Sequence, residues 1–275
     1  MKFFDLFAGI GGFRLGLEQV SSYKCVGWCE NDKFAQKSYK TIHQPTNEYF
    51  RSDARNIDTS ELPEFDLLTA GFPCQDFSIA GDKEGLDGVK GTLFYEIARI
   101  CKNRRPSYFI LENVRGLLTN QEGRTFGRIL QTLDGIGYDL QWQVLRTRDF
   151  GLPQRRERVF IVGHLREKPR PEIFPITEYD RVSPTPCSQP LPTLTATDYK
   201  GPSKQRNSIV VYDEDIGLRK LTPRESWRLQ GFTDEQFEKA QKVNSDTQLY
   251  RQAGNAVSIP VVKEIGRRLK NETQR

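Results

Sequence analysis

Short apolar runs alternate with amphipathic stretches along the first half of the chain. The runs are too short for helices and are rich in Phe, Leu, Ile and Val, whereas the apolar positions between them recur at the helical period. We therefore predict strands at residues 2–7, 24–30, 65–70, 108–112 and 159–162. Strands that alternate with helices form βαβ units, so this half predicts an α/β fold with a mainly parallel sheet flanked by helices.

The composition changes after Leu165. Residues 167–193 contain seven of the fifteen prolines, too many for a helix or a central strand. We expect a domain boundary here, with residues 1–165, completed by 252–275, forming the large domain and 166–251 a small, irregular, β-containing one. Within the second half the pattern predicts a β-like patch at 191–212 and helices at 223–229, 234–243 and 259–270.

Composition narrows the class of protein. The chain has 275 residues, 36% of them hydrophobic, which is enough to bury a core. It has no apolar stretch of the roughly 18 to 20 residues needed to span a membrane, and Asp5 interrupts the first run, unlike a signal peptide. We expect a soluble, cytoplasmic protein. Five cysteines without a CxxC pair and two isolated histidines predict neither a disulfide framework nor a zinc site.

Charge is distributed unevenly along the chain. Residues 1–140 contain 17 Lys/Arg and 19 Asp/Glu, whereas residues 141–275 contain 24 and 17. A basic second half suggests a polyanionic partner such as nucleic acid, although a solvated basic face without a partner fits this asymmetry equally well.

The first predicted strand leads into a glycine-rich turn, residues 7–12, and then into a helical segment. Glycines at such a junction let the backbone approach a ligand, and they also occur in tight turns with no ligand. Glu30 closes the second strand 21 residues after Gly9, where nucleotide-binding folds place a carboxylate against ribose hydroxyls. The spacing departs from GxGxxG, so we predict an adenosine-type cofactor without a pyrophosphate.

Two reactive side chains follow the next strands. Cys74 comes after the third strand, directly behind a proline, and Glu112 ends the fourth. Since ligands lie outside the carboxyl ends of parallel strands, we expect both at the same edge of the sheet. A basic cluster runs into the fifth strand, where alternation predicts that Arg156 and Arg158 face the same side.

Taken together, six blocks resemble, in order, the motifs of the DNA cytosine-5 methyltransferases that use S-adenosylmethionine. The similarity extends from Phe3 to about Val262. The blocks are DLFAGIGGFRLGLE, GFPCQDFS, ENV, QRRERVFIVG, RKLTPRESWRLQGF and QAGNAVSIPVV. The resemblance implies a Rossmann-like catalytic domain that binds the cofactor, and a small domain that recognises the target.

The resemblance also implies roles for individual residues. Cys74 matches the nucleophile and Glu112 the acid, while Arg156 and Arg158 match active-site arginines, Arg158 being the better match for a contact to the cytosine carbonyl. The cofactor shell is expected at Phe7, Gly9, Gly11, Glu30, Asp53, Leu93, Asn255 and Val257. Glu30 is expected at the ribose and Asp53 near the adenine amino group.

The implied activity is methylation of carbon 5 of a flipped cytosine in a specific duplex DNA sequence, as in restriction-modification systems. The expected partners are double-stranded DNA and a cognate restriction endonuclease, and we expect a monomer. The segment at 166–218 is short for target recognition, which favours the alternative that the same chemistry acts on a structured RNA such as tRNA. A catalytically idle DNA-binding relative is a further alternative. A nicotinamide oxidoreductase would leave the Pro-Cys, Glu-Asn-Val and arginine blocks unexplained.

The cofactor block departs from the family pattern at one position. Asn31 follows Glu30, where many relatives carry an aromatic residue that stacks on adenine. We therefore expect other apolar walls in this pocket.

Overall fold

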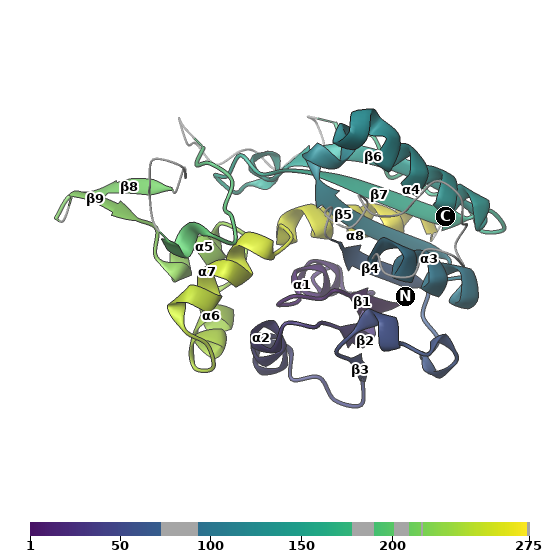
Figure 1. Ribbon diagram of the computed structural model, residues 1–275, viewed down its shortest axis with the longest axis horizontal. Helices are drawn as coiled ribbons and strands as arrows, with labels where there is room; N and C mark the ends of the chain where they lie inside the picture. Colours follow the sequence, from purple (N-terminus) through teal and green to yellow (C-terminus); the bar gives the residue numbers. More distant parts are fainter. Residues whose placement is uncertain (73–92, 178–189, 201–208, 216, 274–275) are drawn as a thin grey trace.

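A computed structural model describes residues 1–72, 93–177, 190–200, 209–215 and 217–273 of the chain (Figure 1). A seven-stranded sheet has the order β3-β2-β1-β4-β5-β7-β6. β7 runs antiparallel to its neighbours β5 and β6, whereas all the other neighbouring strands are parallel. The strands are β1 (Lys2–Leu6), β2 (Lys24–Cys29), β3 (Tyr49–Arg51), β4 (Leu67–Gly71), β5 (Tyr108–Val114), β6 (Tyr138–Arg146) and β7 (Glu157–Leu165).

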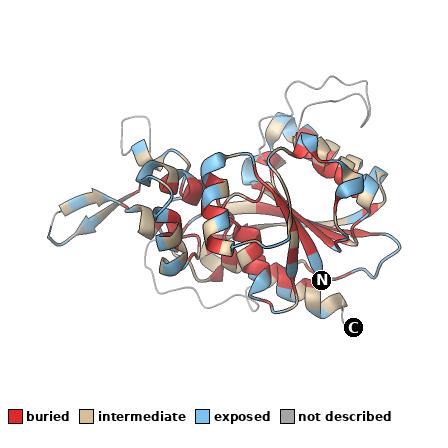
Figure 2. Ribbon diagram, turned by 90° about the horizontal axis from the view of Figure 1, so that it is seen from below, coloured by how far each residue is buried: buried red, intermediate tan, exposed pale blue. Residues whose placement is uncertain are grey.

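Helices cover both faces of this sheet because successive residues of its central strands point to opposite sides. Phe4 packs with α3 and α4 in one core, whereas Phe3 packs with α1 and α8 in the other. Figure 2 shows the buried strands between these layers. The helices are α1 (Gly12–Glu18), α2 (Lys33–His43), α3 (Leu93–Arg104), α4 (Arg124–Gly135) and α8 (Ile259–Thr273).

The remaining elements lie together at one end of the sheet (Figure 1). They are β8 (Val210–Asp213), β9 (Gly217–Lys220), α5 (Pro223–Arg228), α6 (Asp234–Gln241) and α7 (Asp246–Asn255). A third hydrophobic core joins these elements to the part of the chain that contains the seven-stranded sheet, because Ile10 and Ala35 pack in one cluster with Trp227 and Leu249. The glycine-rich turn and the second half of the chain are therefore in direct contact.

The mainly parallel α/β fold predicted from the sequence is confirmed, but the elements differ in detail. The prediction missed β3, β6, β9 and α7, and within the described residues the β-like patch expected at 191–212 coincides with a strand only where β8 begins, at residues 210–212. β6 escaped notice because polar side chains interrupt its apolar pattern. Gln141 and Gln143 accept hydrogen bonds from the backbone amides of Ile173 and Ile176, so these polar positions face neighbouring chain rather than solvent.

The described ranges contain neither a helix suited to span a membrane nor a cluster suited to bind a metal ion. None of their helices combines the length and apolar character that a membrane span requires. The same residues contain no cluster of His, Cys, Asp or Glu suited to a metal ion.

Candidate active site

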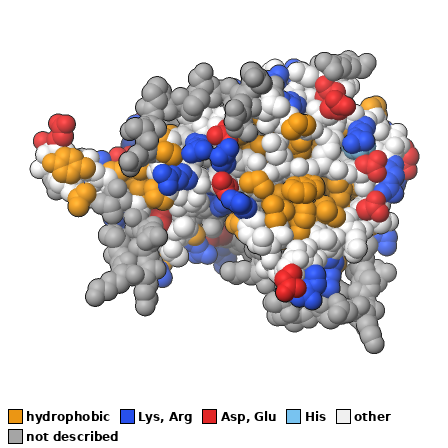
Figure 3. Space-filling model, turned by 90° about the horizontal axis from the view of Figure 1, so that it is seen from above, with side chains coloured by type: hydrophobic (Ala, Val, Ile, Leu, Met, Phe, Trp, Pro, Cys, Tyr) orange, Lys and Arg blue, Asp and Glu red, His pale blue; other side chains and the backbone are white. Residues whose placement is uncertain are grey.

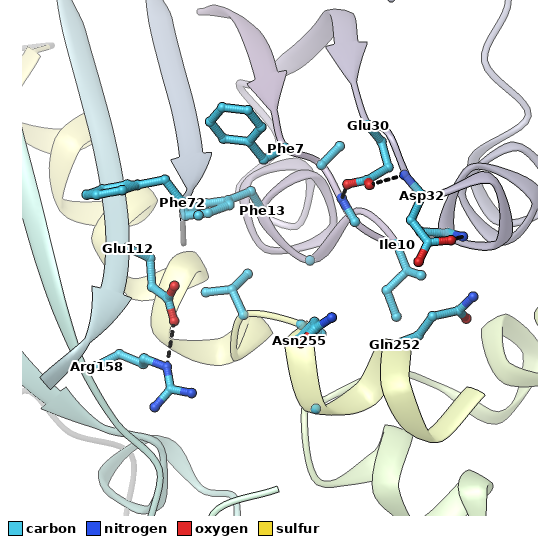
Figure 4. A pocket seen from close by; sticks show the side chains of 18 of the residues that line it. Phe7, Ile10, Phe13, Glu30, Asp32, Phe72, Glu112, Arg158, Gln252 and Asn255 are labelled. Atoms are coloured by element: carbon cyan, nitrogen blue, oxygen red, sulfur yellow. Dashed lines mark hydrogen bonds and ion pairs between the residues drawn. The ribbon is translucent and has the colours of Figure 1, made fainter. Parts of the chain in front are cut away.

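A cavity of about 550 Å³ opens at the carboxyl ends of β1, β4 and β5 (Figure 4). Its walls come from the glycine-rich turn after β1, the ends of β4 and β5, and the turn between α7 and α8. The volume lies within the roughly 300–1,000 Å³ of typical small-molecule sites. This is the edge of the sheet at which the sequence placed both the cofactor and the reactive side chains.

Two side chains, those of Glu30 and His43, form hydrogen bonds with the backbone of the glycine-rich turn. Glu30 accepts hydrogen bonds from the amide of Gly9 (2.8 Å) and from the amide of Asp32 (2.7 Å), one on each carboxylate oxygen (Figure 4). Burial raises the pKa of Glu30, whereas these two backbone hydrogen bonds lower it. Each oxygen keeps a second lone pair, so Glu30 can still accept a hydrogen bond from a ligand in the cavity.

The second side chain is His43, which the sequence analysis did not connect with the site. Its Nε2 lies 3.1 Å from the carbonyl oxygen of Ile10, a residue of the cavity wall. Burial is the main cause that lowers the pKa of His43 to about 3. The imidazole is therefore neutral near pH 7, and Nε2 is the nitrogen that donates to this carbonyl. No local pattern marks His43, because the contact joins the end of α2 to a turn 33 residues earlier.

The predicted cofactor shell is only partly assembled around the cavity. Phe7, Gly9, Glu30, Asn255 and Val257 are among the residues that line it. The described part of the wall does not include Gly11, Asp53 or Leu93. Gly11 is the N-cap residue of α1, and Leu93 is the first residue of α3.

Asp53 is engaged in its own turn. It accepts hydrogen bonds from the backbone amide of Arg55 (3.0 Å) and from that residue's guanidinium (2.7 Å to Nη2). The side-chain hydrogen bond from Arg55 is the largest cause that lowers the pKa of Asp53. A contact from Asp53 to adenine stays a prediction.

Glu112 and Arg158 meet across the β5–β7 ladder, in which Arg158 lies opposite Val114. Nε of Arg158 is 3.0 Å from Oε1 of Glu112, and both side chains are more than four-fifths buried (Figure 4). The contact is an ion pair without hydrogen-bond geometry, so Oε1 of Glu112 has no hydrogen-bond partner among the described residues. One buried carboxylate and one guanidinium thus face the cavity together, a pair suited to a heterocycle that presents a nitrogen beside a carbonyl.

Arg156 also lines the cavity, but its donors are used differently. Its guanidinium donates to the backbone carbonyls of Gly254 (3.1 Å) and Ala256 (2.8 Å), and more weakly to that of Leu194 (3.4 Å). The side chain is almost completely buried, and this burial is the main cause that lowers its pKa to about 9. Arg156 and Arg158 therefore reach the same cavity, as alternation predicted, but only Arg158 pairs with Glu112.

Cys74, the predicted nucleophile, lies outside the described residues. The chain that leads to it is anchored, because Nδ2 of the buried Asn113 donates to the carbonyl oxygen of Phe72 (2.8 Å). Phe72 itself lines the cavity. Cys25 and Cys29 are buried elsewhere, and burial raises the pKa of each thiol to about 12, which makes both poor nucleophiles.

Comparisons with known proteins agree on one group of relatives. A family model described as C-5 cytosine-specific DNA methylase matches residues 1–194 and 182–271. The type II methyltransferase M1.ScrFI of Lactococcus lactis subsp. cremoris is 37% identical over 319 residues, covering 98% of this chain and 77% of the relative. The type II methyltransferase M.NlaX of Neisseria lactamica is 37% identical, covering 98% of this chain and 96% of the relative.

A solved structure supports the fold. The crystal structure of the S. pombe Dnmt2 methyltransferase superimposes with a TM-score of 0.76 at 18% sequence identity, covering 98% of this chain and 99% of that one. Identity at this level supports the shared architecture alone.

Proposed function

The chain belongs to the C-5 cytosine-specific DNA methylases, and we propose that it methylates carbon 5 of a flipped cytosine in a specific duplex DNA sequence, through a covalent adduct of Cys74. Membership makes it a DNA (cytosine-5-)-methyltransferase of the restriction-modification type. The proposal adds the covalent mechanism, the roles of individual residues and the duplex substrate.

The cavity fits S-adenosylmethionine, the methyl donor of this family. When bound, this cofactor supplies an electrophilic methyl group on a sulfonium sulfur. Glu30, with a free lone pair on each oxygen, suits the ribose hydroxyls, and the turn that it holds through Gly9 suits close approach of the ligand to backbone. Asn255 and Val257 line the same cavity from the α7–α8 turn.

The residues of this chain activate the base. Carbon 5 of cytosine is a weak nucleophile until a thiolate adds at carbon 6, which turns the ring into an enamine-like species. Cys74 supplies the thiolate and forms the sulfur–carbon bond. After carbon 5 gains the methyl group and loses its proton to solvent or a base, that bond breaks and the thiolate leaves. The products are 5-methylcytosine, the demethylated cofactor and one proton.

Glu112 and Arg158 stabilise the charge that develops during addition. In its protonated form, the Glu112 carboxyl would donate a hydrogen bond to ring nitrogen 3, and Arg158 would donate to the adjacent carbonyl oxygen. The 3.0 Å ion pair between them is the observation that carries the proposal, because both side chains line the same cavity as the glycine-rich turn.

Duplex DNA fits the charge of the second half of the chain. The target atoms are shielded inside a duplex, so the base must leave the stack at a cost of roughly a few kcal/mol. Lys and Arg side chains gather on one face, between the part that carries β8 and β9 and the body of the sheet (Figure 3). We assign target recognition to the small domain, including residues 192–201. A cognate endonuclease and a monomeric state stay expectations from the resemblance.

The test is transfer of labelled methyl from S-adenosylmethionine to unmethylated genomic DNA and, in parallel, to unmodified tRNA. We expect label in DNA, none with Cys74→Ala, and near-normal cofactor binding by that variant. Turnover by Cys74→Ala would exclude the covalent mechanism. Label in tRNA alone would favour the RNA alternative, which the short segment at 166–218 suggests. Label in neither would favour the idle relative, against which the retained Cys74, Glu112, Arg156 and Arg158 argue.

A further inference from the structure

Arg156 connects two parts of the molecule that have different tasks under the proposed function. Its two terminal nitrogens bind the carbonyls of Gly254 and Ala256, which flank Asn255 in the cofactor wall. One of these nitrogens also binds the carbonyl of Leu194. Leu194 belongs to the segment 191–200, which follows the proline-rich stretch and does not line the cavity in the described part of the chain.

Further contacts fasten the same two segments together. A β-carbon on Gly254 would overlap with the backbone of Thr195, so α7 and the 191–200 segment touch backbone to backbone. Gln154, fully buried, accepts a hydrogen bond from the amide of Leu194 (3.0 Å) and donates to the carbonyl of Leu229 (2.9 Å). Residues 154–156, which lead into β7, are thus hydrogen-bonded to the 191–200 segment, to the Gly254–Ala256 turn and to the end of α5.

The guanidinium of Arg156 is suited to transmit a displacement between the Gly254–Ala256 turn and residues 191–200. Its donors lie in one rigid plane, so the bound carbonyls keep fixed positions relative to one another. The group is buried, and a buried charge that loses an acceptor is strongly destabilised. We therefore expect a shift of the Gly254–Ala256 turn to carry the guanidinium, and with it Leu194, in the same direction.

We infer that Arg156 is a positioning residue that couples occupancy of the cofactor cavity to the ordering of residues 191–200. This inference rests on the proposed function, which places the cofactor against Asn255 and the DNA against this segment. By linkage, DNA that orders the segment tightens cofactor binding by the same factor. The role is more specific than that of an active-site arginine, which the resemblance implies for Arg156.

Hydrogen–deuterium exchange with and without saturating S-adenosylhomocysteine tests the coupling without DNA. The amides of Leu191 and Leu194 are informative because both are hydrogen-bonded, to Pro153 and to Gln154. In the wild type we expect the ligand to slow exchange at 191–198 by about fivefold or more, the lower end of typical allosteric couplings. In Arg156→Lys we expect protection of the turn at 7–12 to persist and protection at 191–198 to disappear.

Two further variants keep the test decisive. Arg155→Lys, a change at an exposed neighbouring arginine, is the matched control and should behave as the wild type. Gly254→Ala leaves the guanidinium intact but forces α7 away from Thr195, so it should also lose protection at 191–198 even if Arg156→Lys fails to fold. Unchanged exchange at 191–198 in the wild type, or full protection in both variants, would overturn the inference. Failure of the wild type to bind the ligand in calorimetry would instead count against the proposed function.

Discussion

The imidazole of His43 occupies the space that a β-carbon on Gly11 would need. Gly11 also has a φ of 86°, a conformation that disfavours any side chain. The same imidazole donates to the carbonyl of Ile10, so one side chain both supports the cofactor turn and excludes substituents from it. A glycine at position 11 thus allows the turn to adopt this conformation, although Gly11 does not line the described part of the cavity.

Gly11→Ala is expected to lower the free energy of unfolding by about 1–3 kcal/mol, because strain at positive φ adds to the overlap with His43. Affinity for S-adenosylhomocysteine should fall with it, since the displaced turn carries Gly9 and Ile10. Urea denaturation and calorimetry measure the two effects. Gly127→Ala in α4 is the matched control, because its β-carbon would meet open space. Equal effects at both glycines would contradict this explanation.

Asp5 should make stability depend on pH. Burial is the main cause that raises its pKa to about 8, from 3.8 in an unfolded chain, and in the part of the chain that the structure describes Oδ2 has no hydrogen-bond partner. A raised pKa in the folded state stabilises the protonated form, so this contribution is complete below about pH 3.8 and is lost as the pH rises through about 8.

Asp5→Asn removes that titration while its amide oxygen can still accept the hydrogen bond from Thr69, which is 2.8 Å long in the wild type. The variant should therefore gain stability relative to the wild type between pH 6.5 and 8.5, by about 1–2 kcal/mol. Urea denaturation at the two pH values checks this. A difference between variant and wild type that does not change with pH would show that Asp5 is not protonated in the folded protein.

Glu112→Gln should separate chemistry from cofactor binding. The amide retains the size of the carboxyl group and can still donate a hydrogen bond to ring nitrogen 3, but it cannot transfer a proton to that nitrogen, so we expect turnover to fall by about 10²- to 10⁴-fold. Affinity for S-adenosylhomocysteine should remain near that of the wild type. Glu157→Gln, at a more exposed carboxylate that pairs with Arg115 instead, is the control and should retain turnover. Methyl transfer at the wild-type rate by Glu112→Gln would remove Glu112 from the mechanism.

Binding to duplex DNA should weaken steeply as salt increases. Each phosphate that Lys or Arg neutralises releases counterions, so the logarithm of the binding constant should fall linearly with the logarithm of salt concentration. Fluorescence anisotropy with a labelled unmethylated duplex measures this slope. The salt concentration is varied from about 50 to about 200 mM, the range over which proteins with several phosphate contacts lose much of their affinity. A flat dependence would argue against the basic half as the DNA face (Figure 3).

Much of the architecture and chemistry was readable along the chain. Alternating runs of apolar residues determined the mainly parallel sheet, because the period of two or of 3.6 residues is set by local backbone geometry. Residues at strand ends, such as Glu30 and Glu112, were assigned to one edge because all parallel strands end on the same side. Polar residues on β6 hid that strand, since the backbone amides that donate hydrogen bonds to Gln141 and Gln143 lie some 30 residues further along the chain and leave no local signal.

Only the tertiary structure determined which partner each of these side chains contacts. Strand alternation predicted only that Arg156 and Arg158 face the same side, but Arg158 pairs with Glu112 whereas Arg156 donates to three carbonyls of distant segments. His43 likewise became part of the site only through a contact across 33 residues. The physical reason is that local sequence controls backbone conformation, while a hydrogen-bond partner depends on which segments the folded core brings within about 3 Å of each other.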